Sequence, residues 1–306
     1  MVSKELITDD EYVRYKICGD QLYLYTSSVT SPGNFITKLS STEYLVNGTR
    51  EIRRFRESEK GYKDIQLLYK SLNEVKHMLE KYAVDRHKCV GITLTYAGTM
   101  RDFSKSGRHF NKFIEKLRTN YGSLEYIAVV ELQKRGVIHY HSVIIFSTRA
   151  PYIDATFLQK LWNYGNVYVE RVKSNKQVAH YFTKYNLDLK ESVALELFPN
   201  DIDDYLTYTE LNEDAKMETY VQDIAIRLLP RNLQVYRHSN GIKIIKTLSG
   251  TKGDVLADVE SGTLDAAYTR TKVDDFTGEV INTIRCERYT IKKKGGVENG
   301  KKNTEL

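Results

Sequence analysis

The sequence predicts an α+β fold in which helices pack on one face of an RRM-like or ferredoxin-like antiparallel sheet. Two observations lead to this prediction. Between residues 88 and 190, strand-like and helix-like apolar patterns alternate in the order β-α-β-β-α-β-α. The two central strands are separated by residues 134–136 (KRG), a turn short enough to join antiparallel neighbours. A hairpin between helical segments is typical of the α+β class.

Local composition supports each element in turn. Strands are expected where β-branched and aromatic residues dominate, and helices where apolar residues recur every three or four positions. Asp154 is a suitable N-cap for the second helix of this region, and Gly122 and Gly165 are natural C-caps. The expected strands are 88–96, 124–133, 137–146 and 166–172, and the expected helices are 108–122, 154–165 and 175–189.

Changes in composition divide the chain into four regions. Residues 1–87 form an accessory region that ends in an amphipathic helix at 64–83. Residues 88–190 form the core, and residues 191–292 form a second accessory region with a hairpin around 267–291. The last residues, 293–306, have few apolar side chains and are expected to be a disordered tail.

The composition is that of a globular protein in a reducing compartment. The 306 residues are 41% hydrophobic and 28% charged, and no stretch approaches the roughly 20 apolar residues that cross a bilayer. Three isolated cysteines give no disulfide framework or cysteine zinc motif, and the polar start is unlike a signal peptide. We therefore expect a cytoplasmic protein with no membrane partner.

The charge and the aromatic residues are compatible with a nucleic-acid partner. The net charge is +6, and 23 tyrosines accompany a single tryptophan. Tyrosine stacks on bases, while lysine and arginine contact phosphates. The basic stretch at 226–246 is expected either to line a DNA path or to form an ordinary solvated surface.

Two histidines in the strand at 137–146 predict a metal site. His139 and His141 flank Tyr140, so both imidazoles point to one face of the strand. Glu131 on the preceding strand lies across the hairpin if its side chain points inward. Two imidazoles and a carboxylate suit Mn²⁺, Mg²⁺, Co²⁺ or Zn²⁺. Chance alone gives roughly 0.2 such histidine pairs in a chain of this composition, so a hydrogen-bonded pair at a sheet edge is the alternative.

A second group of reactive side chains lies on the helix expected at 175–189. Tyr181 and Tyr185 are four residues apart, so both hydroxyls lie on one helix face, with Lys184 beside them. A phenol with a pKa near 10 is a poor nucleophile unless a nearby cation favours the phenoxide. Packing of the two tyrosines at the edge of the core is the alternative for this segment taken alone.

Together these motifs resemble the HUH endonucleases, and among them the rolling-circle replication initiators of phages, viruses and plasmids. An apolar strand (GITLTY, 91–96) is similar to their first motif, and His139-Tyr140-His141 with Glu131 upstream is similar to their second. Their third motif, Y-x-x-K or Y-x-x-K-Y, is matched by residues 181–185 (YFTKY). The order and spacing of the motifs agree, and the resemblance covers about residues 65–190.

The resemblance implies a site-specific DNA nickase and strand transferase. It implies that His139, His141 and Glu131 hold Mn²⁺ or Mg²⁺ at the scissile phosphate. Tyr181 or Tyr185, assisted by Lys184, would attack and leave a 5′-phosphotyrosine and a free 3′-OH. The strand would later be rejoined without ATP. The implied substrate is single-stranded or extruded hairpin origin DNA, and a host helicase and polymerase are the implied partners.

Two other functions are alternatives. A transposase or relaxase of the same superfamily is disfavoured because relaxases place the tyrosine before the histidine strand, and single-tyrosine transposases are much shorter. A non-catalytic single-stranded nucleic-acid-binding protein on an RRM-like sheet would explain the charge and the tyrosines. It would leave the arrangement of the histidines, Glu131 and Tyr181-Lys184-Tyr185 unexplained.

Overall fold

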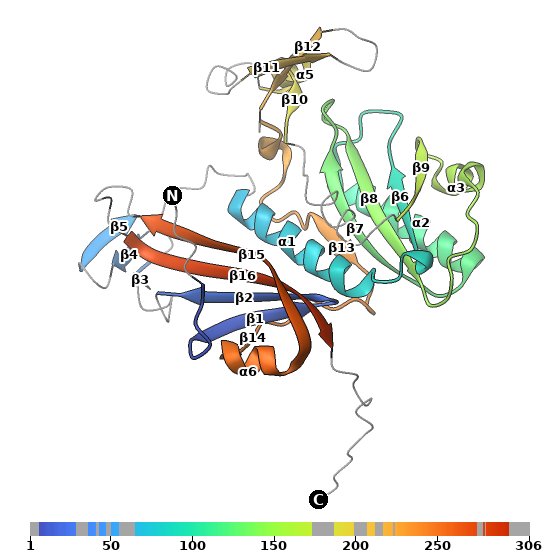
Figure 1. Ribbon diagram of the computed structural model, residues 1–306. Helices are drawn as coiled ribbons and strands as arrows, with labels where there is room; N and C mark the ends of the chain where they lie inside the picture. Colours follow the sequence, from blue (N-terminus) through green and yellow to red (C-terminus); the bar gives the residue numbers. More distant parts are fainter. Residues whose placement is uncertain are drawn as a thin grey trace, which may run out of the picture. The chain divides into compact units, whose positions relative to one another are not determined.

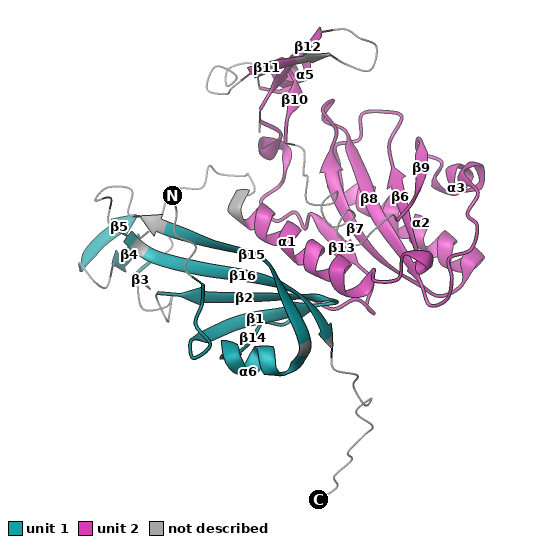
Figure 2. Cartoon of the chain, in the orientation of Figure 1, with its two compact units in different colours: residues 1–57, 245–306 teal, residues 58–244 magenta. Residues whose placement is uncertain are grey.

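A computed structural model describes the chain in eleven segments that fall into two compact units. Unit 1 combines residues 1–57 with residues 245–306, and unit 2 is the continuous stretch 58–244 (Figure 2). The described segments are residues 6–28, 36–40, 43–46, 50–54, 65–172, 187–198, 207–211, 217–222, 224–273, 278 and 280–293.

Unit 2 is built on a five-stranded antiparallel sheet with the strand order β13-β7-β8-β6-β9 (Figure 1). The four strands predicted between residues 88 and 172 are all present, and the predicted α+β class is confirmed. The fifth strand comes from far along the chain and was not predicted. The strands are β6 (Cys89–Leu94), β7 (Leu124–Leu132), β8 (Ile138–Phe146), β9 (Val167–Arg171) and β13 (Tyr236–His238).

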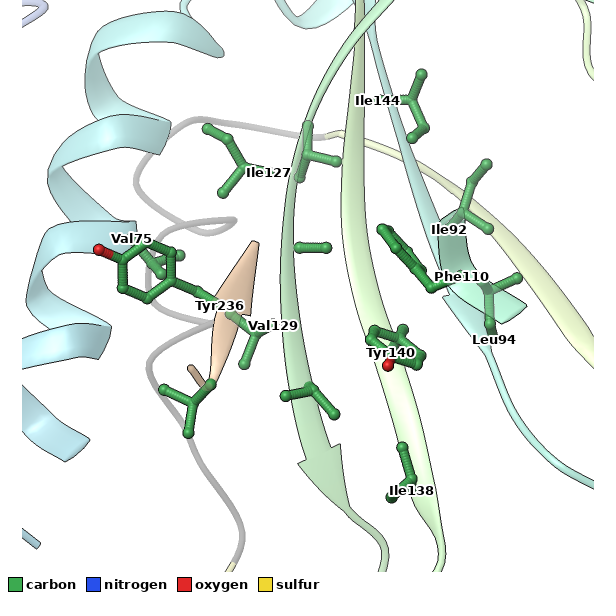
Figure 3. Close-up of a cluster of buried hydrophobic side chains, with 14 of the residues drawn as sticks. Val75, Ile92, Leu94, Phe110, Ile127, Val129, Ile138, Tyr140, Ile144 and Tyr236 are labelled. Atoms are coloured by element: carbon green, nitrogen blue, oxygen red, sulfur yellow. The ribbon is translucent and has the colours of Figure 1, made fainter. Parts of the chain in front are cut away.

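Helices cover both faces of this sheet, not one face as predicted. α2 (Phe103–Tyr121) and α3 (Ala155–Trp162) lie on the face that carries Tyr140, whose ring stacks on Phe110 at 4.6 Å. α1 (Ile65–Tyr82) contacts β7 and β13 on the opposite face. Figure 3 shows Val75 of α1 beside Tyr236, with Phe110 and Tyr140 on the other side of the sheet.

Alternation along β8 separates a core face from a polar face. Ile138, Tyr140 and Ile144 are buried on the α2 face. The Tyr140 hydroxyl lies 3.0 Å from the Ser106 hydroxyl of α2, so its polar end has a partner inside the core. The two histidines between these residues point to the opposite face, as the strand period requires.

Helix ends in unit 2 follow side-chain caps more closely than apolar patterns. α2 begins five residues before the predicted start because Asp102 accepts a hydrogen bond from the Lys105 amide. α3 ends at Trp162, since Asn163 adopts the left-handed conformation that closes a helix. Most of the helix predicted at 175–189 lies outside the described residues, and Leu189 already belongs to a strand.

A smaller three-stranded sheet completes unit 2. Lys190 donates its backbone N–H to the Lys134 carbonyl in the β7–β8 connection, and the Lys134 ammonium lies over the Tyr220 ring at 3.9 Å. These contacts join the small sheet to the hairpin. Its order is β10-β12-β11, with β10 (Leu189–Lys190), β11 (Thr207–Leu211), β12 (Met217–Val221), α5 (Glu191–Leu197) and the 3₁₀ turns η2 (Arg86–Lys88) and η4 (Ile224–Leu228) elsewhere in the unit.

Unit 1 contains a second five-stranded antiparallel sheet, in the order β14-β1-β2-β16-β15. Its buried face packs Leu22 and Leu24 against Val255 of α6, and a separate small sheet β3-β4-β5 belongs to the same unit. The elements are β1 (Tyr12–Cys18), β2 (Gln21–Ser27), β3 (Ile36–Lys38), β4 (Glu43–Val46), β5 (Glu51–Arg54), β14 (Leu248–Thr251), α6 (Lys252–Ala257), β15 (Val259–Val273) and β16 (Val280–Lys293).

A buried ion pair ties the start of the described chain to unit 1. Lys252 Nζ lies 3.0 Å from Glu287 Oε2 and donates to the Ile7 carbonyl at 2.6 Å. The Ile7 amide in turn donates to Glu287 Oε1 at 2.7 Å. Each buried charge is therefore paired and hydrogen-bonded, which is the condition for a stable buried pair.

The two units group the chain differently from the consecutive regions expected from composition. Residues 1–57 pair with the C-terminal hairpin, while α1, expected to close the first accessory region, belongs to unit 2. The expected second accessory region is divided between the units at residue 245. The difference arises because pairing between β2 and β16 joins segments more than 250 residues apart, and composition carries no signal of such pairing.

The described residues show neither a disulfide nor a membrane span. Cys18, Cys89 and Cys286 are buried free thiols. No described helix is long and apolar enough to cross a bilayer.

Gly165 provides a test of packing in unit 2. A Cβ at Gly165 would lie 2.3 Å from the Thr95 carbonyl oxygen, a contact that only a backbone shift can relieve. We expect Gly165→Ala to lower the free energy of unfolding by about 1–3 kcal/mol. Urea unfolding followed by the fluorescence of Trp162, the single tryptophan and fully buried, measures this unit.

Gly98→Ala is the matched control, since a Cβ at Gly98 meets nothing within 4 Å. Its unfolding free energy should stay within about 0.5 kcal/mol of the parent value. Equal effects of the two substitutions would contradict the packing assigned to Gly165.

Candidate active site

The β7–β8 hairpin brings the predicted ligand residues to one place. Glu131 pairs directly with His139 across the hairpin, and Val129 pairs with His141. Directly paired residues of an antiparallel sheet point to the same face, so Glu131 and both histidines share one. The connection between the strands is closed by Gly136, which adopts a φ of 69° and donates its N–H to the Gln133 carbonyl.

Three ligand atoms converge at this point. Glu131 Oε2 lies 2.9 Å from His139 Nε2 and 3.0 Å from His141 Nε2. The two Nε2 atoms are 2.8 Å apart. Their side chains are only 10–12% exposed. Among the described residues these three form a group whose composition and spacing can hold a metal ion.

The spacing of the three atoms fits an octahedral ion. With metal–ligand bonds of about 2.1 Å, neighbouring ligands of an octahedron lie about 3.0 Å apart, and those of a tetrahedron about 3.4 Å. The observed separations of 2.8, 2.9 and 3.0 Å match the octahedral value. Three protein ligands on one face of an octahedron leave the opposite positions for oxygen atoms of a substrate or water.

Hydrogen bonding to the far nitrogen of His141 supports the same assignment. Thr93 on β6 pairs with His141, and its Oγ1 lies 3.2 Å from His141 Nδ1. If Nδ1 carries the proton and donates it to Thr93, the lone pair is on Nε2, where a metal would bind. That lone pair would then face the Glu131 carboxylate without a proton between them. A cation at the centre removes this repulsion.

Burial and hydrogen bonding set the charge states of the triad in opposite ways. Burial raises the pKa of Glu131, but hydrogen bonds with His139 and His141 outweigh it and lower the pKa to about 2. Burial lowers the pKa of His139, and the bond to Glu131 only partly offsets this effect. The group therefore combines an ionised carboxylate with a neutral imidazole at neutral pH, the protonation states that bind metals.

His139 has a second feature that favours a ligand at this site. Its Nδ1 is buried and has no hydrogen-bond partner within the part of the chain that the structure describes. A buried imidazole nitrogen without a partner costs free energy, and such groups are rare away from functional sites. The exposed Arg135 of the hairpin lies close enough for its charge to lower the pKa of His139.

The predicted nucleophile region lies outside the described residues. Tyr181, Lys184 and Tyr185 all fall in the stretch 173–186. The described chain leaves β9 at Val172 and returns at Leu187, and both of these residues are buried in the core of unit 2. The roles of the two tyrosines and the lysine remain predictions.

The structure also identifies site residues that the sequence did not single out. Thr93 lies in the apolar strand motif, and its position opposite His141 depends on the pairing of β6 with β8. Arg135 lies in the predicted turn and donates to the Tyr96 carbonyl at 2.6 Å. By contrast Arg237, in the basic stretch 226–246, donates to the Gly107 carbonyl within the core, so it does not line a DNA path.

Comparison with known families bears on this sheet and its site. Residues 89–190 match the model of a family described as replication-associated protein ORF2. This segment belongs to that family. It is a family of rolling-circle replication initiators, as the motif resemblance implied, and the matched residues make up a third of the chain. No curated protein and no solved structure matches the chain significantly.

The geometry predicts that removing either a ligand or its support weakens metal binding. We expect Glu131→Gln to lower the affinity for Mn²⁺ by more than about tenfold, because it removes the charged ligand. Thr93→Val should lower the affinity by about 10–100-fold, because it leaves the His141 ring without its hydrogen bond. Equilibrium dialysis with Mn²⁺ measures both effects.

His87→Gln is the control, because His87 is exposed on η2, apart from the triad. Its Mn²⁺ affinity should equal that of the parent protein. If Glu131→Gln retained full affinity, the triad would not be the metal site.

Proposed function

We propose that the protein is a rolling-circle replication initiator that nicks and rejoins single-stranded origin DNA through a tyrosine nucleophile. The observation that carries the proposal is the convergence of Glu131, His139 and His141 within 3.0 Å, on the segment that matches a replication-associated family. Residues 88–190 would be the endonuclease core. Single-stranded or extruded hairpin DNA would be the substrate.

The triad would hold Mn²⁺ or Mg²⁺, which when bound supplies a Lewis acid that withdraws charge from the scissile phosphate. The chain's own residues position this chemistry. Thr93 orients His141, and the ionised Glu131 supplies the negative charge that retains a divalent cation. The Tyr140 ring, buried beneath the strand, fixes the backbone on which both histidines stand.

Tyr181 or Tyr185 would carry out the covalent step. The tyrosine oxygen loses its proton and forms a bond to phosphorus, while the bond from phosphorus to the 3′-oxygen breaks and that oxygen takes up a proton. The products are a 5′-phosphotyrosine and a free 3′-OH, which a host polymerase can extend behind a host helicase. Lys184 would favour the phenoxide by its charge. The reverse attack by the 3′-OH rejoins the strand with no need for ATP.

A covalent capture experiment tests this function. The full chain is incubated with Mn²⁺ and a pool of single-stranded oligonucleotides of random sequence, and adducts are resolved on denaturing gels. We expect an adduct with the parent protein and none with the double variant Tyr181→Phe/Tyr185→Phe. His139→Ala should reduce the adduct to the detection limit, and sequencing of captured strands identifies the preferred site.

Tyr152→Phe is the matched control, since Tyr152 is an exposed tyrosine of the same unit with 88% of its surface accessible. It should form adduct at the parent rate. An adduct that persists in the double variant or in EDTA would refute the proposed mechanism.

A further inference from the structure

The loop that follows α3 holds one exposed tyrosine in a fixed position. The Tyr164 carbonyl accepts a hydrogen bond from the Ala97 amide at 3.0 Å, and the next carbonyl but one, of Asn166, accepts from the Thr95 amide at 2.9 Å. Gly165 fits only because it lacks a Cβ, and Asn163 takes a left-handed conformation. The backbone of Tyr164 is therefore locked against the end of β6.

The Tyr164 ring forms the outer layer of an aromatic stack. It lies parallel to the His109 ring, with centroids 3.8 Å apart and an interplanar angle of 4°. His109 Nδ1 lies 3.2 Å from the Tyr96 hydroxyl, and Trp162 lies edge-on to Tyr96 and to Tyr164. Trp162 and Tyr96 are buried, yet Tyr164 keeps 38% of its surface exposed. A flat ring is thus held rigidly at the surface by a buried aromatic support.

Positive charge surrounds this ring. Lys105, Arg108 and Lys112 are exposed and lie three or four residues apart, so they form one stripe along α2 next to His109. Burial lowers the pKa of His109, and the charges of these three residues lower it further, which places them close to the stack. Asp102, the N-cap of α2, opposes them as a single acidic group in that balance.

The stack lies at the same end of the sheet as the triad. Thr93 contacts His141, and Tyr96 follows three residues later on the same chain segment, a separation of about 10 Å at the rise of a strand. The exposed Arg135 spans this gap, since it donates to the Tyr96 carbonyl and its charge acts on His139. About 10 Å corresponds to roughly three nucleotides at the rise of one strand in B-DNA.

We propose that Tyr164, supported by His109, is a stacking platform for an unpaired base, and that Lys105, Arg108, Lys112 and Arg135 hold the adjoining phosphates. An exposed aromatic beside a cationic stripe is the combination by which single strands are bound without sequence readout. The platform grips the strand a few nucleotides from the triad and carries it around the end of the sheet. The inference rests on the proposed function in that the strand held is the strand cleaved.

Binding in EDTA tests the platform without cleavage. Fluorescence anisotropy compares the affinity of the full chain for a 20-nucleotide oligothymidylate and for an abasic strand of the same length. Tyr164→Ala should weaken binding of oligothymidylate roughly 5- to 100-fold, the effect of losing one stacked base, and leave the abasic strand unchanged. Tyr164→Phe keeps the ring and should bind as the parent does.

A charge variant separates the two parts of the surface. Lys105→Gln/Arg108→Gln/Lys112→Gln should weaken both strands alike and reduce the salt dependence of binding by about two counterions. Tyr152→Ala is the control for loss of an exposed tyrosine. Trp162 fluorescence during urea unfolding shows whether each variant retains its core.

The platform is refuted if Tyr164→Ala binds oligothymidylate as tightly as the parent does, or weakens both strands equally. This outcome is independent of the proposed nickase. A chain that forms no adduct with Mn²⁺ can still show base-dependent binding, and a chain without the platform can still form the adduct.

Discussion

The register of the β7–β8 hairpin is the constraint on which the rest of unit 2 depends. Side chains of a strand alternate, so a slip of one residue would move His139 and His141 into the core and Tyr140 to the surface. Tyr140 prevents this slip, because its ring stacks on Phe110 and its hydroxyl contacts Ser106. The apolar face of β8 thereby fixes the polar face, and the close approach of the triad follows from packing on the other side of the sheet.

The same division explains why the polar groups collect at one end of the sheet. The middle of each strand is buried between α1 on one face and α2 and α3 on the other, where a charge could not be solvated. At the end of β6 the chain passes from the buried Leu94 to the exposed residue 97. The triad, Arg135 and the Tyr164 loop all gather where the helical cover ends, so a charged polymer can reach them without unfolding the core.

Local patterns carried most of what the sequence predicted, and non-local pairing limited the rest. The hairpin and the pairing of Glu131 with His139 were accessible because both strands and their turn lie within 23 residues of sequence. β13 was missed because its three residues pair with β7 about 110 positions earlier. Gly165 was interpreted as a helix cap, whereas its role is to approach the Thr95 carbonyl. The stack of Tyr164 on His109 likewise depends on contacts that no spacing encodes.

The order of the two units along the chain has a consequence for synthesis on the ribosome. Unit 2 is one uninterrupted stretch, 58–244, placed inside unit 1. β1 and β2 emerge first but lack their partner β16, which is made last, so their apolar face waits while some 230 residues are added. The unit with the triad can reach its native state during translation, because domains generally fold as they emerge. Premature termination in β16 would thus yield a folded unit 2 flanked by half of a sheet, a species prone to edge-to-edge association.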